Sequence, residues 1–275
     1  MTDQTNVTSV FLGHSCASSL AALAALRAHG LLPAALILAA ADDCILPPGF
    51  VIDDAEIVLA RSPGQASQAL ARLSPEVAVA ACFPWRLSPA AVLAPRLGVL
   101  NIHPSLLPHG RGPEPVFWAF RDGVSETGVT VHRMDATLDT GPILAQQRAL
   151  IPNNADAVSL ECDLMTRGVE LIATAWPALL AGSAQLTPQP PGGGYQPAPG
   201  AADWLISPLL PAAWAWRFSR AVAPLSGPLA VLQRGEVIPV RQPLAWAPDG
   251  PPPGEVPPGT VLLQCRPGWV LFSRN

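Results

Sequence analysis

The first 150 residues alternate short apolar runs with helix-like segments, and this alternation restricts the fold more than any other feature of the sequence. Strands are predicted at residues 10–13, 34–39, 56–60, 76–82 and 99–103, with β-like segments at 128–134 and 142–150. Helices are predicted at residues 17–29, 64–73, 87–93, 114–121 and 156–180. Apolar strands that alternate with helices are typical of a parallel sheet buried on both faces. We therefore expect an α/β fold, with a Rossmann-like, mostly parallel sheet and helices on both faces.

A stretch rich in proline and glycine follows these elements. Residues 184–200 are not expected to form a regular helix or strand, and they suit a semi-rigid connection. Beyond them a helix is predicted near residues 210–221, and short apolar runs follow at 229–233, 237–240, 261–265 and 269–272. The predicted organisation is a first domain over residues 1–183, a linker over 184–202, and a small β-rich, OB-like domain over 203–275.

The charge composition argues against a dedicated nucleic-acid-binding protein. All 16 basic residues are arginine, the sequence contains no lysine, and the formal net charge is −4. A surface that grips a nucleic-acid backbone usually carries a clustered basic stripe, and the sequence shows none.

The cysteine pattern and the apolar stretches predict the compartment. The five cysteines are odd in number and never spaced as C-x-x-C, which disfavours a disulfide framework, a thiolate zinc site and a thioredoxin-type pair. The most apolar stretch, residues 20–41, is interrupted by Arg27, Gly30 and Pro33, so it does not have the unbroken apolar length of a membrane span. No secretory signal is visible at the N-terminus. We expect a soluble, cytoplasmic protein.

Asn101, His103 and Asp139 are the candidate catalytic residues. Asn101 and His103 lie two apart where a predicted strand runs into a loop, so both side chains point to the same side at the usual place for active-site residues. Asp139 lies in a tight turn before the next predicted strand. An amide, an imidazole and a carboxylate suit direct transfer between two bound substrates, because the first two donate to an oxyanion and the third handles protons. On spacing alone, a histidine at a strand end is more often structural.

The residues around these three carry a resemblance to a known family. Residues 101–108 read Asn-Ile-His-Pro-Ser-Leu-Leu-Pro, residues 127–132 Thr-Gly-Val-Thr-Val-His, and residues 138–143 Leu-Asp-Thr-Gly-Pro-Ile. This pattern closely resembles the folate-dependent formyltransferases, which include the methionyl-tRNA, glycinamide ribonucleotide and sugar N-formyltransferases. The resemblance is strong over residues 76–150, fair over the rest of the first 183, and faint at residues 203–204 and 217–224.

The resemblance implies a donor and a site. Asn101 and His103 would stabilise the oxyanion formed when an amine attacks the formyl carbon of 10-formyltetrahydrofolate, while Asp139 would hold His103 and relay a proton through water. No metal is implied. The implied folate pocket comprises Phe83, Trp85, Arg86, Leu87, Thr140, Gly141 and Pro142, with the Leu87 backbone and the turn at 139–141 on the pterin and Arg86 at the glutamate tail. The alternative role for Phe83 and Trp85 is ordinary apolar packing. The alternative role for Arg86 is a solvated charge at the rim of the site.

Three more residues are candidates for substrate binding. Arg111 stands in the family's Arg-Gly-x-x-Pro pattern, where it could meet an anionic acceptor. His109 lies in the loop after the motif, and a plain loop position is its alternative. His132 could line the site from a strand. The alternative is a structural role, as a histidine whose hydrogen bonds are satisfied in the core. Residues 13–15 follow the first predicted strand but lack G-x-G-x-x-G, so no dinucleotide site is expected.

The acceptor is predicted from a departure from the family. The methionyl-tRNA formyltransferases, which this chain resembles, carry a long basic loop after the second strand. The corresponding segment here, residues 40–48, is short and acidic. Asp42 and Asp43 in this segment would repel phosphates. We expect a small-molecule amine or hydroxylamine as acceptor, with tRNA disfavoured and neither DNA nor membrane as a partner. The alternatives are a reduced methionyl-tRNA formyltransferase acting on initiator methionyl-tRNA, and a non-catalytic folate- or RNA-binding relic.

Overall fold

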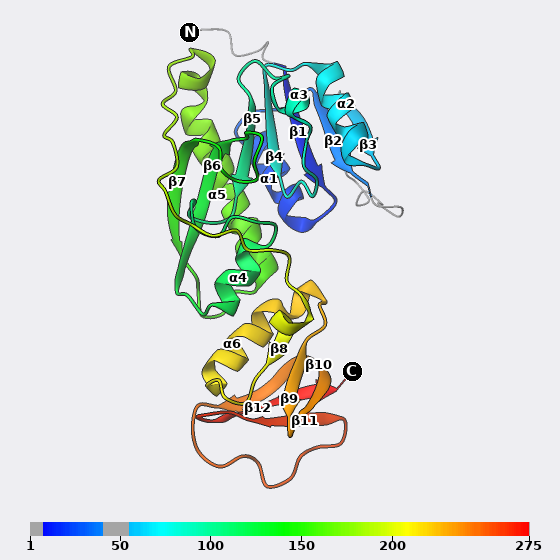
Figure 1. Cartoon of the computed structure of the whole chain (residues 1–275), viewed down its shortest axis with the longest axis vertical. Coiled ribbons are helices and arrows are strands. Elements are labelled where there is room, and N and C mark those ends of the chain that lie inside the picture. Colours follow the sequence, from blue (N-terminus) through cyan, green and yellow to red (C-terminus); the bar gives the residue numbers. More distant parts are fainter. Residues whose placement is uncertain (1–7, 41–54, 275) are drawn as a thin grey trace. The chain divides into compact units, whose positions relative to one another are not determined.

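The computed structural model describes residues 8–40 and 55–274 (Figure 1). The chain divides into two compact units between which the backbone passes more than once. Unit 1 comprises Met1–Pro113, Glu126–Leu150 and Glu161–Gln196, and unit 2 comprises Glu114–Ser125, Ile151–Leu160 and Pro197–Asn275. The expected acidic segment at residues 40–48 lies outside the described residues, except for Ala40. The three-part domain boundaries stay a prediction.

Unit 1 is built on a seven-stranded sheet of order β3-β2-β1-β4-β5-β6-β7. The strands are β1 (Ser9–His14), β2 (Ala35–Ala39), β3 (Glu56–Ala60), β4 (Val77–Ala81), β5 (Val99–His103), β6 (Glu126–Arg133) and β7 (Ile143–Leu150). All pairs among β1 to β5 are parallel, whereas the pairs β5–β6 and β6–β7 are antiparallel. The predicted α/β architecture with a mostly parallel sheet is confirmed.

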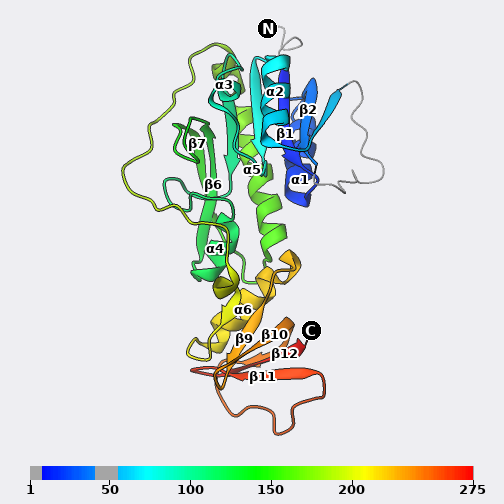
Figure 2. The same cartoon turned by 45° about the vertical axis from the view of Figure 1, so that its right-hand side comes forward.

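Two pairs of helices pack on the sheet of unit 1 (Figure 2). Helices α2 (Pro63–Leu73) and α3 (Pro89–Val92) share one core cluster with Val10 and Leu12 of β1 and Val99 of β5. Helix α1 (Ala17–Ala28) contacts the unit 1 part of α5 (Ala157–Leu180), and Gly168 of α5 packs on Ile102. Because side chains alternate along a strand, Val99 and Ile102 face opposite sides, so the two helix pairs cover opposite faces. Among the described residues, no helix is long and apolar enough to cross a membrane.

Unit 2 holds a second sheet, of order β11-β12-β10-β9-β8. Its elements are α4 (Pro115–Arg121), the 3₁₀ turns Ala201–Trp204 and Ala223–Leu225, β8 (Leu205–Ile206), α6 (Ala212–Val222), β9 (Ala230–Gln233), β10 (Glu236–Ala247), β11 (Thr260–Gln264) and β12 (Trp269–Arg274). Phe117, Trp204 and Phe218 form an aromatic core, with ring centroids 4.8 and 5.6 Å from Phe117. Strand β10 is longer than the predicted run at 237–240, and it bends at register shifts between Val240 and Ala245. The β-rich character is confirmed, whereas the OB-like topology stays a prediction.

The proline- and glycine-rich stretch forms neither a helix nor a strand between residues 184 and 200, as predicted. It does form two isolated bridges within unit 1, one between Thr187 and Ile143 and one between Tyr195 and Arg111. These bridges lay residues 187–196 along the loops that carry the candidate site.

Candidate active site

Strand register brings Asn101 together with His132. The two residues are direct partners on the antiparallel strands β5 and β6, so their side chains lie on the same face. That face is the one that Val99 shares with α2 and α3. Asn101 Nδ2 lies 3.1 Å from His132 Nε2. Because an amide nitrogen only donates, Nε2 accepts here, and His132 Nδ1 has no hydrogen-bond partner among the described residues.

A tight turn between β6 and β7 brings Asp139 back over the strand ends. Arg133 N donates to Pro142 O at 2.9 Å and closes the turn at its base. Gly141 is required there, since a Cβ atom would lie 1.8 Å from the Arg133 carbonyl oxygen. Asp139 itself has a φ of 56°, a left-handed conformation that costs a non-glycine residue free energy unless its surroundings hold it.

The Asp139 carboxylate lies between two imidazoles. Its Oδ1 is 3.7 Å from His103 Nδ1 and 3.7 Å from His132 Nε2. Its Oδ2 accepts a hydrogen bond of 2.9 Å from the Gly112 backbone N–H. The side chains of all three ionisable residues are largely withdrawn from water, with 12% of Asp139, 6% of His103 and 1% of His132 exposed. The structure therefore brings the three predicted catalytic residues and His132 into one cluster.

Burial and charge fix the protonation states of this cluster. Burial alone would raise the pKa of Asp139, but the contact with His132, the attraction of His103 and the Gly112 N–H together lower it to about 2. Burial lowers the pKa of His103 from its ordinary value, and it outweighs the opposing effects of Asp139 and the Gly110 carbonyl. At neutral pH the site thus holds an ionised carboxylate beside a neutral His103.

The tautomer of His103 follows from its second contact. His103 Nε2 donates to the Gly110 carbonyl oxygen at 2.8 Å, because a carbonyl can only accept. In the neutral ring Nδ1 then carries no proton, and it is the nitrogen that faces Asp139. His103 can therefore accept a proton at Nδ1, and the carboxylate next to it would stabilise the resulting imidazolium.

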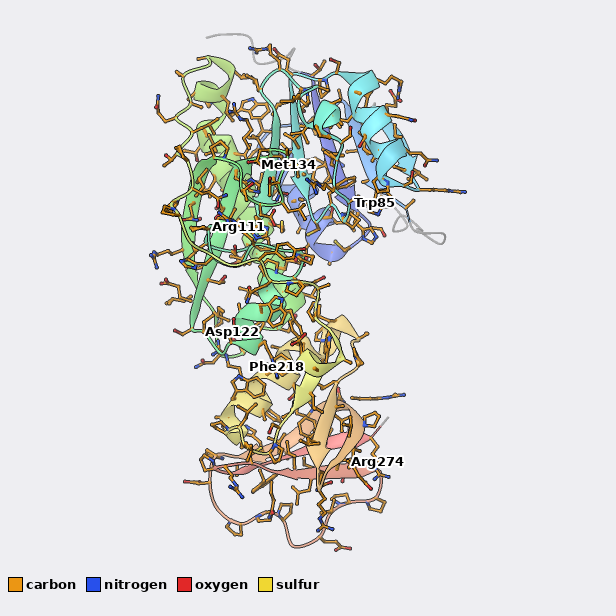
Figure 3. All side chains as sticks on the ribbon, viewed as in Figure 1. Trp85, Arg111, Asp122, Met134, Phe218 and Arg274 are labelled. Atoms are coloured by element: carbon orange, nitrogen blue, oxygen red, sulfur yellow. The ribbon has the colours of Figure 1, made fainter. Side chains whose placement is uncertain are left out.

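The predicted folate residues divide into two groups. Phe83 and Trp85 make an edge-to-face contact with ring centroids 5.8 Å apart, and both pack with Met134 on the core cluster that contains Leu87. A cavity of about 430 Å³ opens beside this cluster, lined by Val92, Leu97, Met134, Ala136 and Pro142 among others. Of the predicted folate residues only Pro142 lines this cavity. Figure 3 labels Trp85 and Met134, which come from different segments of unit 1.

Two other predicted folate residues stabilise the turn around Asp139. The Arg86 guanidinium donates to the carbonyl oxygen of Ala136, so this side chain joins the loop after β4 to the β6–β7 turn. Thr140 Oγ1 donates to Asp135 at 2.8 Å and closes the turn on itself. Arg86 is exposed, so a charge at the rim and a contact with the folate both stay open for it.

Gln189 is a residue of this region that the sequence analysis missed. Its Nε2 donates to the carbonyl oxygens of Asp139 and Gly141 at 2.8 and 2.9 Å, and its Oε1 accepts from Arg111 Nε and Nη2 at 3.2 and 2.6 Å. Arg111 Nε also lies 3.2 Å from the Asp139 carbonyl oxygen. The predicted substrate-binding residue Arg111 thus lies beside the turn that holds Asp139, whereas His109 is exposed on the loop. Within the described ranges no group of His, Cys, Asp and Glu could hold a metal ion.

Sequence comparison identifies the family of this chain. The formyl transferase family profile matches residues 47–175. Methionyl-tRNA formyltransferase of Herpetosiphon aurantiacus is 36% identical over 211 residues, which are 74% of this chain and 66% of that protein. The enzyme of the same name from Thermus thermophilus is 37% identical over 214 residues, 76% of this chain and 65% of that protein. The match to the Roseiflexus methionyl-tRNA formyltransferase, at 42% identity, spans only 39% of that relative.

Solved structures show the same fold at low sequence identity. HypX from Aquifex aeolicus, solved with tetrahydrofolic acid, has a TM-score of 0.68 at 19% identity, covering 98% of this chain and 44% of HypX. An N-formyltransferase from Helicobacter canadensis, solved with folinic acid and dTDP-3-aminofucose, has a TM-score of 0.68 at 14% identity, covering 97% of this chain and 99% of that one. These two structures share the fold of this chain. The chain belongs to the formyl transferase family.

Proposed function

We propose that this protein transfers a formyl group from 10-formyltetrahydrofolate to an amine or hydroxylamine of a small molecule. The observation that carries the proposal is the Asp139 carboxylate held 3.7 Å from both His103 and His132, with Asn101 next to them. Formyl transfer to an amine needs a donor to the developing oxyanion and a group that moves one proton, and this cluster offers both.

Each residue then has a distinct part. Bound 10-formyltetrahydrofolate would supply the formyl carbon that the amine attacks. Asn101 donates an amide N–H to the oxyanion that develops on the formyl oxygen. His103 accepts at Nδ1 the proton that the amine gives up, and in the protonated form it adds a second donor to the oxyanion. It then passes the proton to the folate nitrogen as the bond between that nitrogen and the formyl carbon breaks, which releases tetrahydrofolate. Asp139, whose pKa is about 2, stabilises the imidazolium and is itself a weak base, so its part is chiefly to hold His103.

The residues beside the site fit a folate donor. A pterin needs a flat apolar slot with main-chain hydrogen-bonding groups at its edge. Phe83 and Trp85 pack beside Leu87 and Met134, and Met134 and Pro142 line the adjacent cavity of about 430 Å³. HypX and the Helicobacter canadensis enzyme, which share the fold, were solved with tetrahydrofolic acid and folinic acid respectively. The individual pterin contacts stay predictions.

Folinic acid titration tests the donor site. We expect the wild-type protein to bind folinic acid with a change in Trp85 fluorescence, and calorimetry to give a saturable isotherm. Leu87→Asp should abolish binding, whereas Leu32→Asp, at a side chain 59% exposed elsewhere in unit 1, should leave it intact. Circular dichroism would verify folding, and Trp85→Leu offers a second, milder change. Equal affinity in all variants would show that the folate binds elsewhere.

A small acceptor is favoured by charge. The chain has no lysine, and the acidic segment with Asp42 and Asp43 stands where a basic, phosphate-binding loop is needed for tRNA. Initiator methionyl-tRNA is the second candidate, because the curated relatives that cover most of this chain are methionyl-tRNA formyltransferases. A non-catalytic relic is the third, and the complete Asn101–His103–Asp139 set argues against it.

An acceptor panel separates these candidates. Release of tetrahydrofolate from 10-formyltetrahydrofolate would be followed at moderate salt with amino sugars, ornithine derivatives, amino acids and charged initiator tRNA. Turnover of a free amine without nucleic acid is the expected result. Saturable formylation of the tRNA alone would establish the second candidate, and no turnover with any acceptor would favour the relic.

A further inference from the structure

The segment of residues 187–196, here called the strap, is fixed to unit 1 at both ends. Thr187 exchanges two backbone hydrogen bonds of 2.8 Å with Ile143, the first residue of β7. Gln196 N donates to Arg111 O at 2.8 Å, in the loop that follows β5. Gly112 has a φ of 120°, and a Cβ atom there would lie 1.9 Å from the Gln196 carbonyl oxygen, so only glycine permits this approach. The strap is therefore held at both ends against the segments that surround the candidate site.

Gln189, the third residue of the strap, uses the full hydrogen-bonding capacity of its amide. A glutamine amide has two N–H donors and an oxygen with two lone pairs. Here both N–H groups donate to backbone carbonyls of the turn around Asp139, those of Asp139 and Gly141. The amide oxygen accepts two hydrogen bonds from the Arg111 guanidinium. No other side chain offers two donors and two acceptors at this reach with this planar geometry, so the position is chemically specific for glutamine.

We propose that Gln189 is a positioning residue that fixes the Asp139 carboxylate between its two imidazoles and holds the Arg111 guanidinium beside it. The inference rests on the proposed function. Asp139 has a left-handed backbone, and such conformations persist only where surrounding contacts over-determine them. Its carboxylate oxygens are fixed by Gly112 and the histidines, and its carbonyl by Gln189, so both ends of the residue are held.

The consequence for the reaction follows from geometry. A displacement of about 1 Å in a catalytic group can cost a factor of about 10² in rate. With Gln189 truncated, the turn loses two hydrogen bonds at its carbonyls, and the carboxylate samples positions farther from His103 and His132. Weaker contact with both rings removes much of what lowers the pKa of Asp139, so this pKa should rise toward its ordinary value.

The test combines variants at Gln189 with a matched control in the same chain segment. Gln189→Ala removes all four hydrogen bonds, while Gln189→Glu keeps the shape and the Arg111 contact but loses both donors. Gln185→Ala is the control, because in the part of the chain that the structure describes that amide hydrogen-bonds only to the Ser183 carbonyl, at 3.4 Å. The pKa of the Asp139 carboxyl would be followed by carbon-detected NMR, which needs no acceptor, and tetrahydrofolate release would give kcat and KM.

In Gln189→Ala we expect the pKa of Asp139 to rise clearly above 2 and kcat to fall about tenfold or more, with KM for the folate donor within about twofold of wild type. Gln189→Glu should behave alike, and Gln185→Ala should match wild type. If the pKa and kcat of both Gln189 variants equal those of Gln185→Ala, the strap is a structural tether and the inference fails. Full activity in His103→Ala and Asp139→Asn would instead overturn the proposed function, so the two failures are distinguishable.

Discussion

Asn101 and His132 face each other across the antiparallel β5–β6 pair, with the amide nitrogen of one 3.1 Å from the ring nitrogen of the other. His132 is therefore the partner of Asn101, which we propose donates to the oxyanion, and it lies as near to Asp139 as His103 does. This contact orients the Asn101 amide without using it up, because the amide nitrogen has a second N–H.

The first prediction concerns this contact. His132→Ala should lower kcat about tenfold. Asn101 loses the partner that orients its amide, and Asp139 loses one of the two imidazoles beside its carboxylate. His29→Ala, at an exposed histidine that follows α1, is the matched control and should have no effect. Steady-state kinetics of tetrahydrofolate release would decide. Wild-type kcat in His132→Ala would show that His132 is a core histidine only.

The second prediction concerns acid stability. The pKa of Asp139 is lowered to about 2 from 3.8, so the ionised form favours the folded state. This contribution is fully present above pH 4 and is lost as the pH falls from about 4 to about 2; it amounts to roughly 2 kcal/mol. In Asp139→Asn the stability at pH 7 should fall, and the decline between pH 4 and pH 2 should be shallower. Urea unfolding across this pH range measures both. A parallel acid decline in the two proteins would contradict the account.

The third prediction concerns the charge of His103. Burial lowers its pKa below the ordinary 6.5, so the ring is neutral at pH 7 and gains a proton only as the pH falls further. The unfolded chain binds this proton first, so His103 contributes stability that is lost as the pH drops through 6.5. Nitrogen-15 NMR of the histidine rings should show a neutral His103 with its proton on Nε2. A pKa above 6.5, or a proton on Nδ1, would remove His103 as the proton acceptor.

The fourth prediction concerns a thiol near the first helix. A hydrogen bond from Cys82 chiefly lowers the pKa of Cys16, to about 5, and His14 and the Ser19 backbone help, whereas burial raises the pKa of Cys265 to about 11. A lowered pKa raises the thiolate fraction of Cys16 at pH 7, and thiolates are the reactive form. Among these two thiols of the native protein, iodoacetamide should alkylate Cys16 far faster than Cys265, as read by peptide mass spectrometry. Equal rates would show that Cys16 is an ordinary thiol.

Much of unit 1 was predictable because its strands are continuous apolar runs. The run at 99–103 and the two-residue spacing of Asn101 and His103 were enough to predict that both point into one site. The partner of Asn101 was not predictable, because it depends on the β5–β6 register, and residues 104–125 separate these two strands in the chain. That register is a long-range property, and nothing local to His132 reveals it.

The role of Gln189 could not be predicted from the sequence for a related reason. It lies in a stretch with no period of 2 or 3.6, where residues such as Pro188 and Pro190 predict a connection and nothing more. Its four hydrogen bonds all go to residues at least 48 positions earlier in the chain. Likewise β10 is longer than the run at 237–240 that predicted it, because prolines and polar residues at its exposed positions break the apolar pattern without ending the strand.

The central claim is that formyl transfer takes place at His103. The most direct test is the rate of tetrahydrofolate release from 10-formyltetrahydrofolate, with the acceptor panel present, in wild type and in folded His103→Ala. We predict acceptor-dependent release in wild type and a loss by a factor of about 10² or more in the variant, because one donor to an oxyanion is worth about 10²–10³ in rate. Release that is undiminished in His103→Ala, or absent from wild type with every acceptor including the tRNA, would contradict the account.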